Sequence, residues 1–284
     1  MTAKVMKLIE VYYRSYICSG TNTITKKALI AWEKKSLPKS VGGYNLINLK
    51  VWNKAAVTKI HWDLAQKEDK AWTRWIHVYY IKGQSIPEMN IPQQAIWMMR
   101  KIMEARKTMQ QVLDLKQRQS VIKHIYLGLL GNHNKVEWRP LIFYNEARPK
   151  AVSTMWIQCH ERMLTADRLT KWGIQVSPRC SLCLNADESH LHLFGECSFS
   201  RLVWLRLLRW LQIWDAPMNP WSQVVIWLIL QSKGKLCKSK ILKMMYAEYI
   251  YGIWKERNSR IFEDQTRNEE QIVREVSCIC NIRT

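Results

Sequence analysis

The residues of this chain best suited to chemistry are cysteines and histidines in one short polar segment. Cys180, Cys183, His192 and Cys197 follow the pattern C-x2-C-x8-H-x4-C. Thiolate and imidazole groups hold Zn2+ in tetrahedral sites, and a C-x2-C pair on a tight turn directs two sulfurs to one point. A segment this short has no core of its own, so metal binding would supply its folding energy. The spacing therefore predicts a zinc site, and the alternative is a set of free cysteines in a reduced core.

Two histidines compete for the imidazole position. His190 and His192 are two residues apart, so both would face one side of an extended segment. His192 gives the four-residue spacing to Cys197 that is found in zinc knuckles. We expect His192 to be the ligand, with His190 as the alternative. Four protein ligands leave no position for an activated water, so the predicted Zn2+ is structural and not catalytic.

The charge of the chain indicates a polyanionic partner. The sequence holds 44 Lys and Arg against 23 Asp and Glu, a formal net charge of +21. Residues 1–150 contain 26 of the basic and 10 of the acidic residues, whereas residues 151–200 are nearly neutral. A positive field of this size attracts phosphate polymers. We therefore expect RNA or DNA as the partner, and the alternative is a solvated surface; no small-molecule substrate is evident.

The most regular basic face is predicted on a helix over residues 93–115. Ala95, Ile102 and Met109 recur at helical spacing and form its expected buried side. Trp97 is the aromatic residue placed to stack on an unpaired base. The candidate nucleic-acid contacts on this helix and in the earlier lysine-rich segment are Arg100, Lys101, Lys107, Lys34 and Lys35.

Hydrophobic periodicity predicts a mainly α protein that positions these residues. Apolar residues recur at threes and fours in six segments, which are residues 1–20, 46–67, 93–115, 151–174, 200–214 and 241–263. In the first segment Val5, Leu8 and Tyr12 form the expected apolar face. Trp221–Gln231 is a buried helix or a buried strand, because its β-branched residues leave both open.

Hydropathy and cysteine usage predict an intracellular protein. The apolar run from Val224 to Leu230 has seven residues, whereas a helix that crosses a bilayer needs roughly 20. The N-terminus lacks the apolar stretch of a secretory signal. No membrane partner is therefore expected. The eight cysteines then belong to a reducing compartment, where metal binding is more common than disulfides.

Motifs around the cysteines resemble the zinc-binding region that follows the polymerase domain in plant non-LTR retrotransposon reverse transcriptases, of the long interspersed element type. The resemblance is carried by Leu164 to Leu169, Trp172 to Ile174, Cys180, Cys183, Glu188, His192 to Phe194, Cys197 and Trp204. Supporting similarity comes from Ala31-Trp32, Pro38-Lys39, Gly42-Gly43 and Asn53 to Ala56 upstream, and from Ile253 to Asn258 downstream.

The resemblance implies a helical thumb-like region, then a small zinc-binding Cys/Cys/His/Cys loop, then C-terminal helices. Its parts would be a basic helical region at residues 1–130, a zinc-binding domain at 145–215 and a helical extension at 216–284. In relatives such a module would grip template or target nucleic acid, which also implies a nuclear location. The alternative is a zinc-pinned helical remnant of a truncated transposon copy, with no nucleic-acid function.

The chain also departs from this family. Gly42-Gly43-Tyr44-Asn45 stands where Gly-Gly-Leu-Gly is usual, and the loop holds two histidines in place of one. Polymerisation by two metal ions needs clustered carboxylates, which reverse transcriptases supply as an Asp-Asp pair. The sequence contains no Asp-Asp pair. We therefore expect a fragment without the polymerase active site, and no enzymatic activity from this chain.

Overall fold

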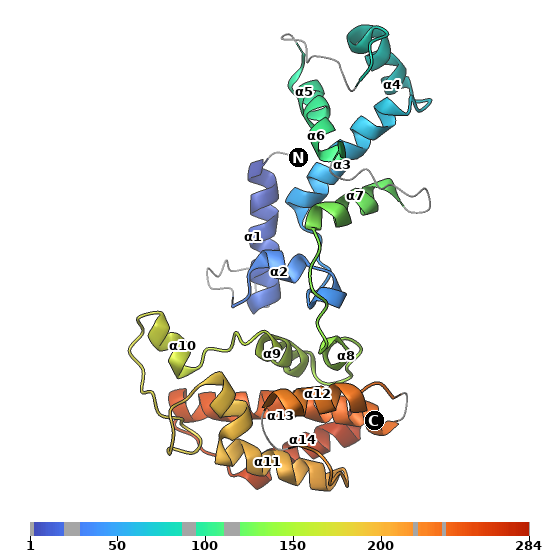
Figure 1. Ribbon diagram of the computed structural model, residues 1–284. Helices are drawn as coiled ribbons and strands as arrows, with labels where there is room; N and C mark the ends of the chain where they lie inside the picture. The colour runs from blue at the N-terminus through green and yellow to red at the C-terminus, as the bar shows by residue number, and fades with distance from the viewer. Residues whose placement is uncertain are drawn as a thin grey trace. The chain divides into compact units, whose positions relative to one another are not determined.

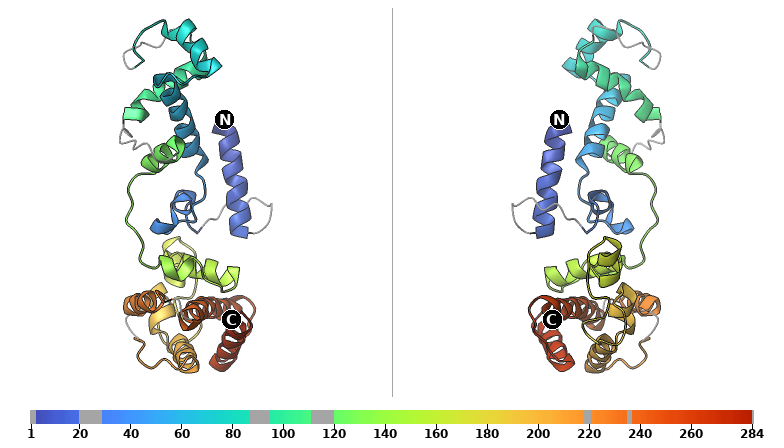
Figure 2. Two further views of the ribbon diagram at one scale, coloured as in Figure 1. Left: turned by 90° about the vertical axis from the view of Figure 1, so that its right-hand side faces the viewer. Right: turned by 90° about the vertical axis from the view of Figure 1, so that its left-hand side faces the viewer.

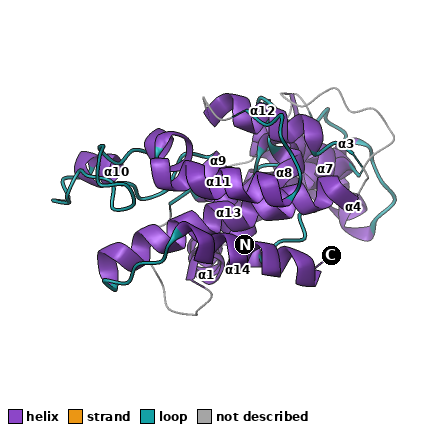
Figure 3. Cartoon of the chain, turned by 90° about the horizontal axis from the view of Figure 1, so that it is seen from below, coloured by secondary structure: helices purple, strands orange, loops and turns teal. Residues whose placement is uncertain are grey.

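The computed structural model describes most of the chain. The described residues are 3–19, 29–86, 95–110, 120–217, 221–234 and 237–283. Within these ranges the regular elements are helices and no strand is formed (Figure 3). Arg179 and Asp187 make an isolated antiparallel bridge. The mainly α fold class is therefore confirmed. No helix in the described part of the chain combines the length and the apolar character that a membrane crossing requires.

The chain divides into two compact units. Unit 1 comprises Met1–Pro38 and Gly43–Asn134, and unit 2 comprises Lys39–Gly42 and Lys135–Thr284. The helices of unit 1 are α1 (Ala3–Ser19), α2 (Trp32–Ser36), α3 (Leu49–Ala65), α4 (Ala71–Ile76), the π-helical η2 (His77–Ile81), α5 (Trp97–Glu104), α6 (Arg106–Gln110) and α7 (Val121–Leu130).

Helix α3 organises unit 1. Asn48 begins the helix, because its side-chain oxygen accepts a hydrogen bond from the Val51 N–H at 3.2 Å. Helices α1, α5, α6 and α7 pack against α3 (Figure 1). One buried cluster of this unit consists of Leu64, Ile76, Ile81, Ile86, Ala95, Met99, Ile102 and Met103.

The helix predicted over residues 93–115 is interrupted in the structure. Helices α5 and α6 are separated at Ala105, and residues 93–94 and 111–115 lie outside the described residues. Ala95, Ile102 and Met109 are buried, so the predicted inner face is confirmed for these three residues. Their common face packs toward α3, because both helices contact it.

Helix α1 forms as predicted, but its buried side differs from the expected one. Val5, Leu8 and Tyr12 are exposed, whereas Met6 and Glu10 are buried. The difference arises because α1 packs on α3, where Lys50 Nζ lies 3.3 Å from a carboxylate oxygen of Glu10. The buried side of α1 therefore includes both the apolar Met6 and the charged Glu10.

Unit 2 is built around one long helix. Its elements are the short helix η1 (Lys39–Val41), α8 (Arg139–Ile142), α9 (Pro149–Cys159), α10 (Ala166–Lys171), the π-helical η3 (His192–Glu196), α11 (Ser198–Trp210), α12 (Trp221–Gln231), α13 (Cys237–Phe262) and α14 (Glu269–Arg283). Trp221–Gln231 is thus a helix. Helix α13 contacts α9, α11, α12 and α14, and Figure 2 shows α13 and α14 as neighbours.

The short segment Lys39–Gly42 is fastened to the rest of unit 2 through the carbonyl oxygen of Gly42. The Trp156 indole N–H donates to Gly42 O at 2.7 Å, and His160 Nε2 lies 3.2 Å from the same oxygen. Gly42 has φ +88°, and a Cβ at this position would approach the Trp138 ring to 2.7 Å. Glycine is therefore required both by the backbone conformation and by the lack of space.

Candidate metal centre

Local backbone hydrogen bonds fold the C-x2-C segment into a tight turn. The Cys180 N–H donates to Ala186 O at 2.8 Å, and the Leu184 N–H donates to Cys180 O at 2.9 Å. Leu184 adopts φ +61°, a left-handed conformation that turns the chain back after Cys183. The second pair of donors comes from the π-helical turn η3, because the Cys197 N–H donates to His192 O at 2.7 Å.

The structure brings the four donor atoms of Cys180, Cys183, His192 and Cys197 together. All lie within 4.8 Å of one another. The sulfurs of Cys180 and Cys197 are 3.9 Å apart, and Cys183 Sγ lies 3.3 Å from His192 Nε2. Zinc–sulfur bonds of about 2.3 Å in a tetrahedron place two sulfurs about 3.8 Å apart. The donor set therefore fits a tetrahedral zinc ion in both spacing and chemistry.

The two most buried sulfurs of the cluster share a hydrogen bond. The Cys180 thiol donates to Cys197 Sγ, and this bond together with burial raises the pKa of Cys180. The same hydrogen bond lowers the pKa of Cys197. A metal ion would keep both sulfurs deprotonated.

His190 lies outside this cluster. Its Nε2 is 3.0 Å from Gln158 O, and its ring lies against Phe194. Burial lowers the pKa of His190, which favours the neutral ring. The expectation that both histidines face one side is wrong, because the segment is helical and residues two apart then point in different directions. Of the two, His192 is the residue that the structure brings to the three cysteines.

Glu188 fastens the cysteine segment to two helices. The Ala166 N–H at the start of α10 donates to Glu188 Oε1 at 2.8 Å, and the Asp167 N–H donates to Glu188 O. Thr165 occupies the N-cap position of α10, but its hydroxyl donates to Asp167 instead of capping the helix. From α13, Arg257 Nη2 donates to Glu188 Oε1 at 2.7 Å.

Arg260 on α13 braces the C-x2-C turn directly. Its Nη1 donates to the carbonyl oxygens of Ser181 at 3.2 Å and Leu182 at 3.0 Å. Glu256 orients the guanidinium, because its Oε1 accepts from Arg260 Nε at 2.8 Å. The role of Arg260 was not predicted from the sequence. The spacing of Glu256 and Arg260, four residues apart on one helix, was the available signal.

The candidate nucleic-acid contacts all lie in unit 1, where they are distributed over three helices. Lys34 on α2, Arg100 and Lys101 on α5, and Lys107 on α6 are exposed. Lys101 Nζ pairs with Glu104 at 2.5 Å. Lys35 differs from expectation, because it is only 5% exposed. Its neighbours Trp32 and Ser36 are also buried, so this side of α2 faces inward and Lys35 is no surface contact.

Comparisons with known proteins agree with this geometry. Residues 121–204, which include all four donors, match the family model described as zinc-binding in reverse transcriptase. An Arabidopsis thaliana protein named "Putative ribonuclease H protein" is 26% identical over 80 residues, which is 28% of this chain. The chain covers 13% of that relative's length. No solved structure matches the chain. The resemblance to the reverse transcriptase zinc region is therefore confirmed for this segment.

Proposed function

We propose that this chain is a zinc-stabilised, nucleic-acid-binding C-terminal fragment of a retrotransposon reverse transcriptase, without a polymerase active site. The observation that supports the proposal most is the convergence of four zinc-type donors inside the segment that matches the reverse transcriptase family model. Cys180, Cys183, His192 and Cys197 would hold the ion. Zinc would supply cross-linking and no reaction chemistry, because the protein fills all four ligand positions.

The proposed zinc site connects parts of unit 2 that are distant in sequence. The ion would join the Cys180 turn to Cys197, the residue that precedes α11. The buried pair of Glu188 and Arg257, and the contacts of Arg260, extend this connection to α13. In the proposed organisation, residues 1–130 form the basic region, residues 145–215 bind zinc, and residues 216–284 support the zinc loop through α13.

Nucleic-acid binding is proposed for unit 1 from its charge. The first 150 residues hold most of the basic excess. The exposed residues Lys34, Arg100, Lys101 and Lys107 are candidates for phosphate contacts. Phosphate contacts carry no sequence information, so we expect binding to many RNA or DNA sequences. A role on DNA would require a nuclear location, which a fluorescent fusion of the full chain would test.

The absence of polymerase or nuclease activity is part of the proposal. The most buried carboxylates of unit 2 are occupied by arginines, as Glu188 pairs with Arg257, and Glu248 pairs with Arg148 at 2.6 Å. A carboxylate fixed in such a pair holds no catalytic metal ion. Because polymerisation requires clustered free carboxylates, this chain would bind nucleic acid without cutting or extending it.

Metal analysis and nucleic-acid titration of the full chain test the proposal together. We expect about one zinc ion per chain, and binding of labelled RNA or DNA that weakens steeply between low and moderate salt, because phosphate contacts release counterions. A zinc-containing chain that binds neither nucleic acid at low salt would support the zinc-pinned remnant instead. A chain without zinc would contradict both functions.

A further inference from the structure

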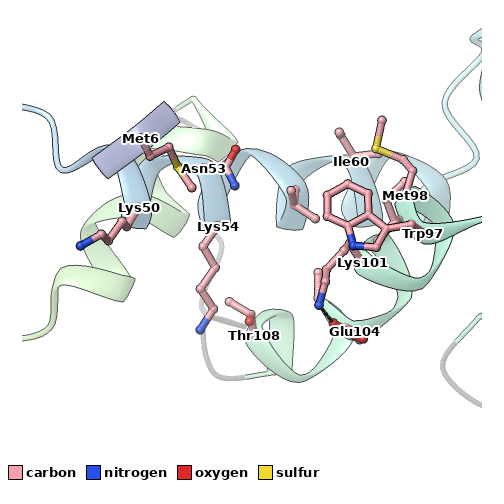
Figure 4. A pocket seen from close by; sticks show the side chains of 13 residues that line it. Met6, Lys50, Asn53, Lys54, Ile60, Trp97, Met98, Lys101, Glu104 and Thr108 are labelled. Carbon is pink, nitrogen blue, oxygen red and sulfur yellow. Dashed lines mark hydrogen bonds and ion pairs between the residues drawn. The ribbon is translucent and has the colours of Figure 1, made fainter. Parts of the chain in front are cut away.

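A groove in unit 1 lies between α3 and the pair α5 and α6 (Figure 4). Its volume is about 500 Å³, within the range of about 300–1,000 Å³ that is typical of ligand pockets. Val57 and Ile60 line it from α3, and Ile102 and Ala105 line it from the opposite side. The groove therefore has apolar walls on both sides.

Two large apolar side chains stand exposed at this groove. Trp97 is 66% exposed and Met98 is 57% exposed, although α5 has buried positions at Met99 and Ile102. Figure 4 shows the indole of Trp97 between Ile60 and Lys101. An exposed indole beside an apolar hollow is suited to a flat ring, because aromatic faces stack on nucleobases.

Ammonium groups line the same groove. Lys50 and Lys54 come from α3, and Lys101 comes from α5. Among the described lining residues Glu104 is the single carboxylate, and it pairs with Lys101, while Lys50 pairs with Glu10 of α1. Lys54 makes no ion pair with any described residue, and its side chain extends toward Thr108 (Figure 4). The groove is thus positively charged as well as apolar.

We propose that this groove binds single-stranded nucleic acid. One unpaired base would lie against Trp97 and Met98, and the neighbouring phosphates would contact Lys54 and Lys101. A polyanion with flat apolar rings matches the lysines and the indole at once, whereas a duplex keeps its base faces covered by their neighbours. The inference rests on the proposed nucleic-acid function. It adds where the nucleic acid binds and that the bound form is single-stranded.

Titration of the zinc-containing full chain with a labelled single-stranded oligonucleotide, and with the duplex of the same sequence, tests this proposal. Wild-type protein should bind the single strand more tightly. Trp97→Ala should weaken single-strand binding about 5- to 100-fold, since stacking on one aromatic residue has an effect of this size. Lys54→Glu should also weaken single-strand binding. The slope of log affinity against log salt concentration should decrease by about the contribution of one phosphate contact or more. Both side chains are exposed, so the thermal unfolding temperature should stay unchanged.

Matched variants outside the groove serve as controls. Trp214→Ala removes another highly exposed tryptophan, and Lys82→Glu makes the same charge reversal at another exposed lysine of unit 1. Both should bind the single strand nearly as wild type does. Unchanged binding by Trp97→Ala, or equal wild-type affinity for duplex and single strand, would overturn the inference and leave the proposed function intact. Failure of wild type to bind either form would instead refute the proposed function.

Discussion

Arg257 on α13 and Glu188 in the cysteine segment form a bidentate ion pair with almost no solvent exposure. Arg257 Nη2 lies 2.7 Å from Glu188 Oε1, and Arg257 Nε lies 3.0 Å from Oε2. The side chains are 5% and 1% exposed. Because Glu188 also accepts from the Ala166 N–H, one carboxylate joins the cysteine segment, α10 and α13.

Removing one partner of this pair should strongly destabilise the protein. Arg257→Met leaves the Glu188 carboxylate buried without its main donor, which costs about 3–5 kcal/mol in comparable cases. Denaturant unfolding of the zinc-containing protein measures the loss. Arg274→Met is the control, because the Arg274–Glu270 pair is exposed and such pairs contribute about 0–1 kcal/mol. Equal losses of unfolding free energy in the two variants would show that the buried pair stabilises the protein no more than the exposed pair does.

Arg260 should increase the zinc affinity of the site although it is not a zinc ligand. Arg260→Gln removes the donor that holds the carbonyls of Ser181 and Leu182, so the C-x2-C turn becomes less well ordered. Loss of comparable supporting contacts weakens metal affinity about 10- to 100-fold. Competition for zinc with a chromogenic chelator gives the affinity. Arg209→Gln changes an exposed arginine on α11 and should leave the affinity unchanged; a similar decrease in this control would assign the effect to charge alone.

Glu275 should make the stability depend on pH in acid. Burial raises the pKa of Glu275, but Lys255 nearby and the hydrogen bond from Arg267 outweigh burial, so the pKa lies below its ordinary value of 4.5. A carboxylate with a lowered folded-state pKa stabilises the fold above the unfolded pKa, and this contribution is lost as the pH falls through the folded pKa. Glu275→Gln should therefore be less stable than wild type at pH 7, and the difference should shrink below about pH 4.5.

Denaturant unfolding at several pH values measures this difference. Zinc release in acid affects wild type and Glu275→Gln alike, because Glu275 is not among the four donors, so it cancels in the comparison. Glu270→Gln, at an exposed position of the same helix, should show a smaller difference at every pH. A difference between wild type and Glu275→Gln that is constant from pH 7 into acid would rule out the proposed titration.

The chain should show no polymerase or nuclease activity. Primer extension and cleavage assays with Mg2+ or Mn2+ should give only background, because the sequence lacks an Asp-Asp pair and the most buried carboxylates of unit 2 are held by arginines. Activity that survives repurification and disappears on substitution of a carboxylate of this chain would contradict this prediction.

Local spacing made the cysteine cluster and helices such as α1, α3, α11 and α13 predictable, whereas α7, α14 and the long-range contacts were not predicted. The C-x2-C pattern and the four residues between His192 and Cys197 are properties of short segments. The pairing of Glu188 with Arg257 joins positions 69 residues apart, and no periodicity reports such a contact. The burial of Lys35 and the exposure of Val5 likewise depend on which neighbour each helix meets.

In the proposed zinc site His192, and not His190, completes the ligand set with the three cysteines. Zinc content per chain after dialysis against a mild chelator, measured for wild type, His192→Gln and His190→Gln, tests it most directly. We predict about one zinc ion in wild type and in His190→Gln, and a large loss in His192→Gln. Wild type without zinc, or zinc retained by His192→Gln and lost from His190→Gln, would contradict the claim.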